Sequence, residues 1–201
     1  MRERGFTLLE LLIALSIVVA LLVILLSGLR IGLRAWRQGE DRAEAHQHLR
    51  SLAELLSRSV AGTFPYRMSP PAGGSPLVQF QGSERQLAFV TLSPPVPLAA
   101  PIAFTAVTLA HEAGERPGLS VRVRALPNVD PFEVETPALL DPAVDEITFR
   151  YLRPGGQWEE SWDGAAERGL PEAVEIRLTP RINGRVEPFP ALTVRLRARH
   201  R

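Results

Sequence analysis

The chain has 201 residues, of which 45% are hydrophobic, so it is long enough for one ordinary domain with a packed core and an additional segment. Its 23 basic and 22 acidic residues leave a net charge of +1, which gives no reason to expect nucleic-acid binding. The lack of cysteine excludes disulfides, thiolate zinc sites and a cysteine nucleophile.

The first predicted element is an apolar helix near the N-terminus. Residues Leu11–Leu29 are almost entirely apolar, and at 1.5 Å per residue they span roughly 28 Å, about the thickness of a bilayer core. The segment is apolar on all sides, so lipid or the interior of a helix bundle is its expected surrounding. A removable secretory signal fits less well, because no convincing small-residue cleavage site follows and an acidic residue, Glu10, stands at the start. An ordinary anchor helix is the alternative.

The helix is predicted to continue past the apolar span as an amphipathic segment that ends at Ala61–Pro65. Gly28, Gly32 and Gly39 each weaken it by about 1 kcal/mol relative to alanine, so a bend is expected near them. The apolar residues of this segment recur at spacings of 3, 4 and 4 and therefore form one narrow stripe, which consists of Leu49, Leu52, Leu56 and Val60.

From Pro65 onward the sequence changes to short strand-like runs joined by proline- and glycine-rich connections. Apolar and polar residues alternate in several runs; Val174 and Ile176, for example, alternate with Glu175 and Arg177. This alternation predicts antiparallel sheet with one face toward water. The expected strands cover residues 77–81, 86–92, 102–111, 119–126, 146–152, 173–180 and 192–200.

The N-terminal sequence "RGFTLLELLIALSI" resembles the signal of type IV prepilins and type II secretion pseudopilins. In that family a short basic leader ends in glycine, and a dedicated prepilin peptidase cleaves after it. The resemblance implies cleavage between Gly5 and Phe6, N-methylation of Phe6, and a role in assembly for Glu10. Because the cut would precede the apolar span, the helix would be kept.

The chemistry of Glu10 is consistent with that role. A charge at the centre of a bilayer costs about 2.5–3.5 kcal/mol on insertion scales, and such residues usually have a function. Cleavage exposes an amine on Phe6, four residues away on the same helical face. Glu10 can neutralise this amine in its own subunit or in the subunit ahead in a bundle, where a misaligned subunit would leave an unpaired charge. The alternative is that Glu10 only lies at the membrane interface.

Residues 155–179 resemble the J-type minor pseudopilin of type II secretion, in which a tryptophan-containing hairpin and a Leu-Pro-x-Ala-Val segment precede a late strand. From the residues alone, the two tryptophans need only close one end of the core. The positions that match the J-type pattern are Trp158, Trp162, Leu170, Pro171, Ala173 and Val174.

The predicted fold is α+β and type IV pilin-like, with a long N-terminal helix, transmembrane in its first half, packed on an antiparallel β domain. The boundaries are 1–5 for the leader peptide, 6–29 for the transmembrane and assembly helix, 30–64 for its amphipathic continuation, and 65–201 for a periplasmic β domain.

No catalytic or metal-binding pattern is apparent, so neither enzyme activity nor a cofactor or metal is expected. His46 and His48 point to different faces of the helix, and His111 and His200 have no paired ligand. Phosphate-loop, nucleophile-elbow and zinc-protease motifs are absent from the sequence. An acidic segment without calcium-loop spacing is expected to be either a solvated loop or a docking surface, and it contains Asp130, Glu133, Glu135, Asp141, Asp145 and Glu146.

The prediction for function is a structural, J-like minor pseudopilin at the pseudopilus tip that primes assembly and supports export across the outer membrane. Its expected partners are I-like and K-like minor pseudopilins, the major pseudopilin and prepilin peptidase, and it would cross the bacterial inner membrane once. More arginines follow the span than precede it, which by the positive-inside rule argues weakly against a periplasmic C-terminus.

One flank of the amphipathic helix is expected to meet the sheet, and the other to meet a partner helix. The alternatives are a minor pilin of a type IV pilus or DNA-uptake pseudopilus, and a membrane-anchored periplasmic enzyme or binding domain. The residues assigned to the partner seam are Ala45, His48, Leu49, Leu52 and Leu56.

Overall fold

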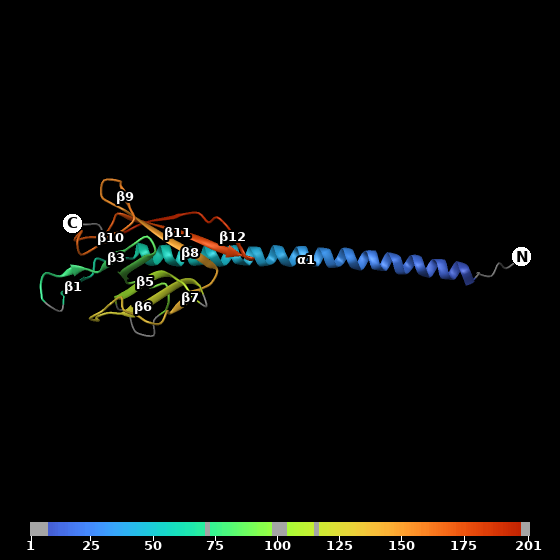
Figure 1. The fold of residues 1–201 in the computed structure, drawn as a ribbon, viewed down its shortest axis with the longest axis horizontal. Coiled ribbons are helices and arrows are strands. Elements are labelled where there is room, and N and C mark those ends of the chain that lie inside the picture. Colours follow the sequence, from blue (N-terminus) through green and yellow to red (C-terminus); the bar gives the residue numbers. More distant parts are fainter. Residues whose placement is uncertain (1–7, 71–72, 98–103, 115–116, 198–201) are drawn as a thin grey trace, which may run out of the picture. The chain divides into compact units, whose positions relative to one another are not determined.

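A computed structural model describes residues 8–70, 73–97, 104–114 and 117–197 (Figure 1). Gly5 and Phe6, the predicted cleavage site, lie outside these ranges. Contacts within the chain divide it into two compact units, Met1–Glu44 and Ala45–Arg201.

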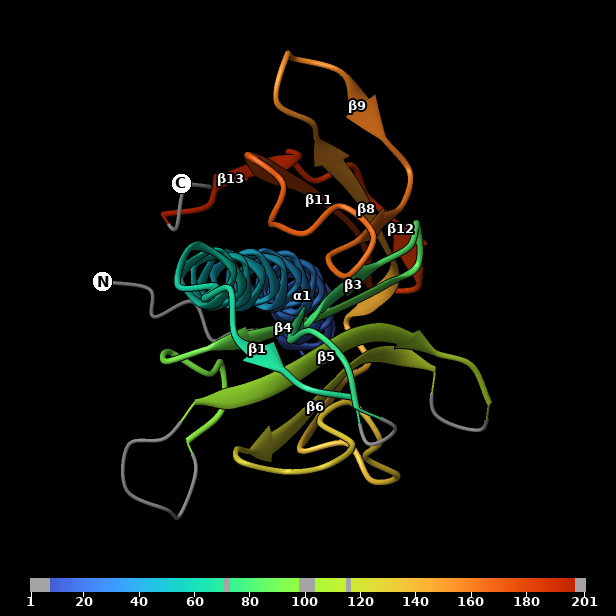
Figure 2. The same ribbon diagram turned by 90° about the vertical axis from the view of Figure 1, so that its left-hand side faces the viewer.

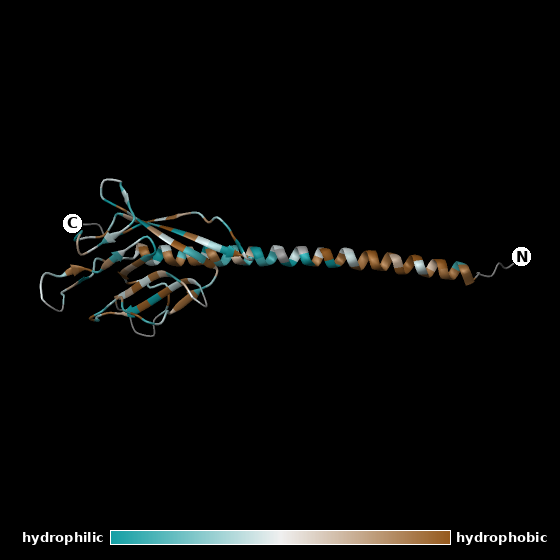
Figure 3. Cartoon of the chain, in the orientation of Figure 1, coloured by the Kyte–Doolittle hydropathy of each residue, from teal (hydrophilic) through white to brown (hydrophobic). Residues whose placement is uncertain are grey.

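One α-helix, α1, runs from Leu8 to Ala61. It passes through Gly28, Gly32 and Gly39 without a break. In the described ranges it is the one helix that is long and apolar enough to cross a membrane, judged by length and composition. Figure 3 shows that hydrophobic residues dominate its N-terminal half.

The end of α1 is set by hydrogen bonds and by the sequence that follows. The amides of Gly62 and Thr63 donate to the carbonyls of Arg58 and Val60 at 3.1 and 3.0 Å, and the Thr63 hydroxyl also donates to Val60 at 2.6 Å. These bonds satisfy carbonyls that a helix end leaves open. Pro65, two residues after Thr63, has no amide proton with which to continue the helical hydrogen bonds.

The rest of the second unit is antiparallel β-structure in two main sheets and a two-stranded ribbon. The ribbon pairs β1 (Arg67–Met68) with β2 (Leu77–Val78). The six-stranded sheet has the order β10-β3-β4-β5-β6-β7 and comprises β10 (Trp162–Asp163), β3 (Phe80–Gly82), β4 (Gln86–Thr91), β5 (Thr105–Glu112), β6 (Gly118–Ala125) and β7 (Leu139–Asp141).

The five-stranded sheet has the order β12-β11-β8-β9, with β13 also paired to β11. It comprises β12 (Arg185–Val186), β11 (Ala173–Ile182), β8 (Val144–Leu152), β9 (Trp158–Glu159) and β13 (Leu192–Arg195). Asn183 and Gly184, at the turn between β11 and β12, have φ values of 51° and 76°, the left-handed conformation that hairpin turns require.

The core lies between the two sheets and the last turns of α1, which Figure 2 shows enclosed between β11 and β13 on one side and β4 and β5 on the other. The predicted stripe supplies the helix side of this core. Its four residues are almost fully buried: Leu49, Leu52, Leu56 and Val60. The structure therefore confirms the predicted α+β fold and the prediction that the amphipathic half of the helix covers a sheet.

Tyr151 joins the two sheets inside the core. It lies on β8, is fully buried, and donates its hydroxyl proton to the carbonyl of Ser83 at 2.9 Å, beyond the end of β3. Burial raises the pKa of this phenol. Its ring occupies the space beside Gly82, where a Cβ atom would come within 2.3 Å of the ring. Only glycine fits at that position without displacing the tyrosine.

All the expected strands have a counterpart, but the structure corrects several details. The predicted strand 77–81 is interrupted at Gln79, whose amide donates to Tyr66 rather than to the main sheet. The last strand ends at Arg195, and residues 198–200 of its predicted range lie outside the described residues. The sequence predicts one hairpin for Trp158 and Trp162, whereas these residues belong to different sheets, paired with β8 and β3 respectively.

Candidate functional site

The candidate site is α1, whose two halves meet different surroundings. In the first half, Glu10 stands in the first helical turn and is the one charged residue in the segment Leu8–Leu29. The large apolar side chains of that segment are all more than half exposed, from 51% at Val18 to 83% at Leu8. A patch this extensive requires lipid or other apolar helices to cover it.

The C-terminal part of α1, Ala45–Ala61, has a buried face and an open face. At 100° per residue, the buried stripe and the exposed side chains fall on opposite sides of the helix. Apart from His48, the exposed side chains form what we call the open flank: Gln47, Arg50, Ser51, Glu54, Leu55 and Arg58.

This arrangement separates the five residues predicted for the partner seam. Leu49, Leu52 and Leu56 are 1%, 5% and 0% exposed and belong to the domain's own core, so their side chains do not reach a partner. Ala45 is half-buried and packs against that core. On the open flank, Leu55 is the large apolar residue, at 41% exposed.

Two histidines mark the borders between the two faces. Nε2 of His48 lies 2.7 Å from Oδ2 of Asp141 at the end of β7, and Nε2 of His46 lies 3.6 Å from Oε2 of Glu187, between β12 and β13. Each histidine thus contacts a carboxylate associated with a different sheet. The His48 side chain is 54% exposed, although one of its ring nitrogens is engaged by Asp141 within the domain.

Two residues of the acidic segment, Asp141 and Asp145, make contacts that stabilise the fold. Asp141 is buried, and its other oxygen accepts a hydrogen bond from the amide of Ala143 at 3.0 Å. Asp145 pairs with Arg181 on β11 at 2.6 Å. The His48 contact to Asp141 joins residues 93 apart in the chain, and no local pattern signals it. Within the described ranges, no three potential ligands come together as a metal site.

Two further ion pairs stabilise the sheet surfaces. The Arg122 guanidinium lies 2.6 Å from Glu112 and holds the pKa of that carboxyl below its usual range. Arg153 binds Glu167 through two hydrogen bonds of 2.9 Å, which lower the pKa of that carboxyl. Arg153 also lies over the ring of Trp162, whose indole donates to Gly169 at 3.0 Å. These contacts hold the connection between the two sheets in place.

Comparison with known protein families gives two matches. Residues 1–26 match a family model described as the prokaryotic N-terminal methylation motif, and residues 27–191 match one described as type II secretion system (T2SS), protein J. No curated protein matches the chain significantly.

The two matches agree with the helix described above. The methylation motif implies processing by prepilin peptidase, and the exposed apolar span of α1 fits a membrane anchor. The secretion family is structural and works together with other pseudopilins. The chain belongs to the protein J family of the type II secretion system and is a minor pseudopilin of that system.

Proposed function

We propose that this chain is a tip subunit of the periplasmic pseudopilus that primes assembly through α1. The observation that carries this proposal is the exposed apolar segment Leu8–Leu29 of α1, with a single carboxylate in its first turn and a methylation motif around its start. Lipid covers such a helix before assembly, and neighbouring subunit helices cover it within the fibre.

Processing prepares that helix. Cleavage between Gly5 and Phe6 would create a cationic amine on Phe6, which is then methylated. In the fibre, Glu10 pairs with the amine of a neighbouring subunit, and a subunit out of register leaves a charge unpaired in an apolar bundle. A carboxylate is costly in lipid, and pairing with a neighbour's amine offsets this cost in the correct assembly.

The open flank selects partners in the periplasm. It contains one large apolar side chain, Leu55, and an ion pair in which Glu54 and Arg58 lie 2.9 Å apart and are both exposed. An exposed ion pair of this kind contributes about 0–1 kcal/mol to stability, so either residue can pair with a charged side chain of a partner at little cost. We assign this surface to the helices of the I-like and K-like minor pseudopilins, with the major pseudopilin following below in the fibre.

In this proposal, one pass of the chain lies in the bacterial inner membrane and residues 65–201 lie in the periplasm. Ion pairs and hydrogen bonds fix the surface of the β domain. In the proposed fibre, this domain lies at the end that faces the outer membrane. Export is then supported mechanically, without a reaction catalysed by this chain.

The test is complementation of a secretion-deficient deletion strain with Glu10→Leu. The matched control is Ser16→Leu, which raises the apolarity of the same span but keeps the carboxylate; the Ser16 hydroxyl bonds only to its own helix, at the carbonyl of Ile13. We expect both variants to insert and to be cleaved, and only Glu10→Leu to lose secretion. Full secretion by Glu10→Leu would overturn the assembly role of the carboxylate.

A further inference from the structure

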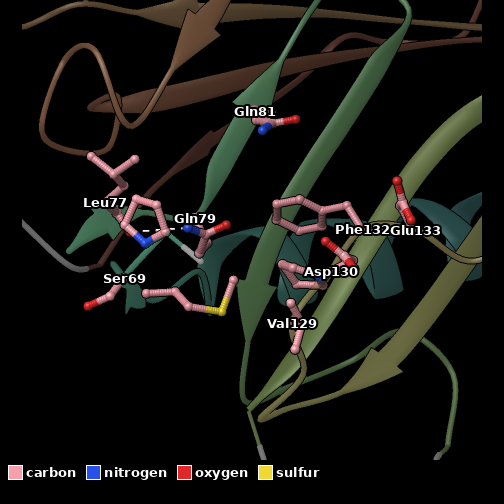
Figure 4. A pocket seen from close by; sticks show the side chains of 11 residues that line it. Ser69, Leu77, Gln79, Gln81, Val129, Asp130, Phe132 and Glu133 are labelled. Atoms are coloured by element: carbon pink, nitrogen blue, oxygen red, sulfur yellow. Dashed lines mark hydrogen bonds between the residues drawn. The ribbon is translucent and has the colours of Figure 1, made fainter. Parts of the chain in front are cut away.

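A groove of about 340 Å³ lies beside the β1–β2 ribbon (Figure 4). One wall is formed by the ribbon and by β3, with Gln79 and Gln81. The other wall is the connection between β6 and β7, with Asp130, Phe132 and Glu133. We propose that this groove binds an extended segment of a partner protein that carries a Lys or Arg next to an apolar side chain.

Apolar side chains line the floor and ends of the groove. Leu77 is 38% and Val129 is 66% exposed, and Met68 and Phe132 are half-buried beside them. Covering these side chains removes apolar surface from water, which is favourable. The occupant therefore needs at least one apolar side chain.

The charge of the groove lining determines which charged side chains the bound segment can carry. Among the described residues of the lining, Asp130 and Glu133 are charged and none is basic. Within the described ranges neither carboxylate takes part in a salt bridge. The nearby Arg124 guanidinium, which bonds to the backbone of both residues, offsets one of the two charges, so the wall stays net negative and favours a basic side chain over an acidic one.

The acidic wall is held in place from behind. One nitrogen of Arg124 donates to the main-chain carbonyls of both Asp130 and Glu133, each at 2.7 Å. The guanidinium thus anchors the backbone of this wall and leaves the two carboxylates unpaired. Because the wall is already fixed, less conformational entropy is lost when a partner binds.

The size of the groove indicates an extended segment rather than a helix. Its volume is near the lower end for a small-ligand site and suits a few side chains. A second hollow of about 720 Å³ shares Asp130, Phe132 and Glu133 and continues over the face of β5 and β6. There Arg122 is neutralised by Glu112, and the remaining basic residue of this lining, Arg124, is outnumbered by the acids Asp130, Glu133 and Glu135.

The experiment measures fluorescence anisotropy of two labelled peptides, Leu-Arg-Val-Arg-Leu and Leu-Glu-Val-Glu-Leu, with the full chain in zwitterionic lipid nanodiscs and empty nanodiscs as a blank. The peptides share their apolar residues and differ in charge. We expect the basic peptide to bind, the acidic peptide not to bind, and the affinity of the basic peptide to fall as salt rises. Equal binding of both peptides, or binding independent of salt, would overturn the proposal.

Variants then locate the binding site. Asp130→Asn combined with Glu133→Gln should weaken binding of the basic peptide roughly tenfold, while Glu160→Gln, an exposed acid outside the groove, should have no effect. Ser69→Trp should block binding by filling the groove. Thermal melts establish that each variant is folded. Folded groove variants that bind like the wild type would place the site elsewhere and contradict the proposal, whatever the outcome for Glu10.

Discussion

Replacing Leu56 by alanine tests the assignment of the two faces of α1. Leu56 is completely buried between the helix and the sheets, so Leu56→Ala removes three carbon atoms from a packed core and leaves a cavity. Truncations of this kind cost about 2–5 kcal/mol, against a total stability of about 5–15 kcal/mol for an ordinary domain. For a unit of this size, a loss of that order lowers the melting temperature by roughly 4–20 °C.

The matched control is Leu55→Ala, one residue away. It makes the same chemical change on the same helix, but Leu55 is 41% exposed on the open flank. We expect a stability change of about 0.5 kcal/mol or less. Thermal melts of both full-length variants, followed by circular dichroism, provide the comparison. Equal destabilisation by the two substitutions would refute the assignment of a buried and an open face.

Three further substitutions test other contacts by the same melts. Gly82→Ala should destabilise the domain by several kcal/mol, because its Cβ would come within 2.3 Å of the buried Tyr151 ring, and a wild-type melt would show that the ring can move away. His48→Ala should cost about 1–3 kcal/mol, because the buried carboxylate of Asp141 loses its imidazole partner; no loss would mean that water replaces it. The folded-state pKa of Glu112 is lowered, chiefly by its hydrogen bond to arginine, so its contribution is present above the ordinary glutamate pKa and is lost as pH falls through the lowered value. Glu112→Gln should therefore reduce the loss of stability as pH falls through this range. An unchanged profile of stability against pH would mean that other carboxyls cause the loss.

The elements that could be predicted from the sequence are those with a long, regular pattern. The leucine stripe of α1 and the alternation in 173–180 each extend over enough residues to define a period, and both lie where the pattern predicts. Strands β1, β9 and β10 have two residues each, which is too short for any period. The same limit explains the wrong hairpin for Trp158 and Trp162, whose sheet partners lie elsewhere in the chain.

Contacts between distant residues account for what could not be predicted at the candidate site. The open flank follows from the helical period, but the engagement of His48 does not, since Asp141 reaches it only after the six-stranded sheet has formed. The groove likewise depends on two connections around residues 69 and 130 that the fold places opposite each other. The acidic residues there were visible in the sequence, whereas their separation into paired and unpaired groups required the structure.

Site-specific photocrosslinking from the open flank tests the central proposal most directly. A photoreactive amino acid at Ser51, in the middle of that flank, is compared with the same amino acid at Glu160, an exposed position outside it, in cells with an active type II secretion system. The account predicts that mass spectrometry identifies I-like or K-like minor pseudopilins crosslinked from position 51 and not from position 160. Crosslinks to those subunits from position 160 alone would show that the helix is not the assembly surface.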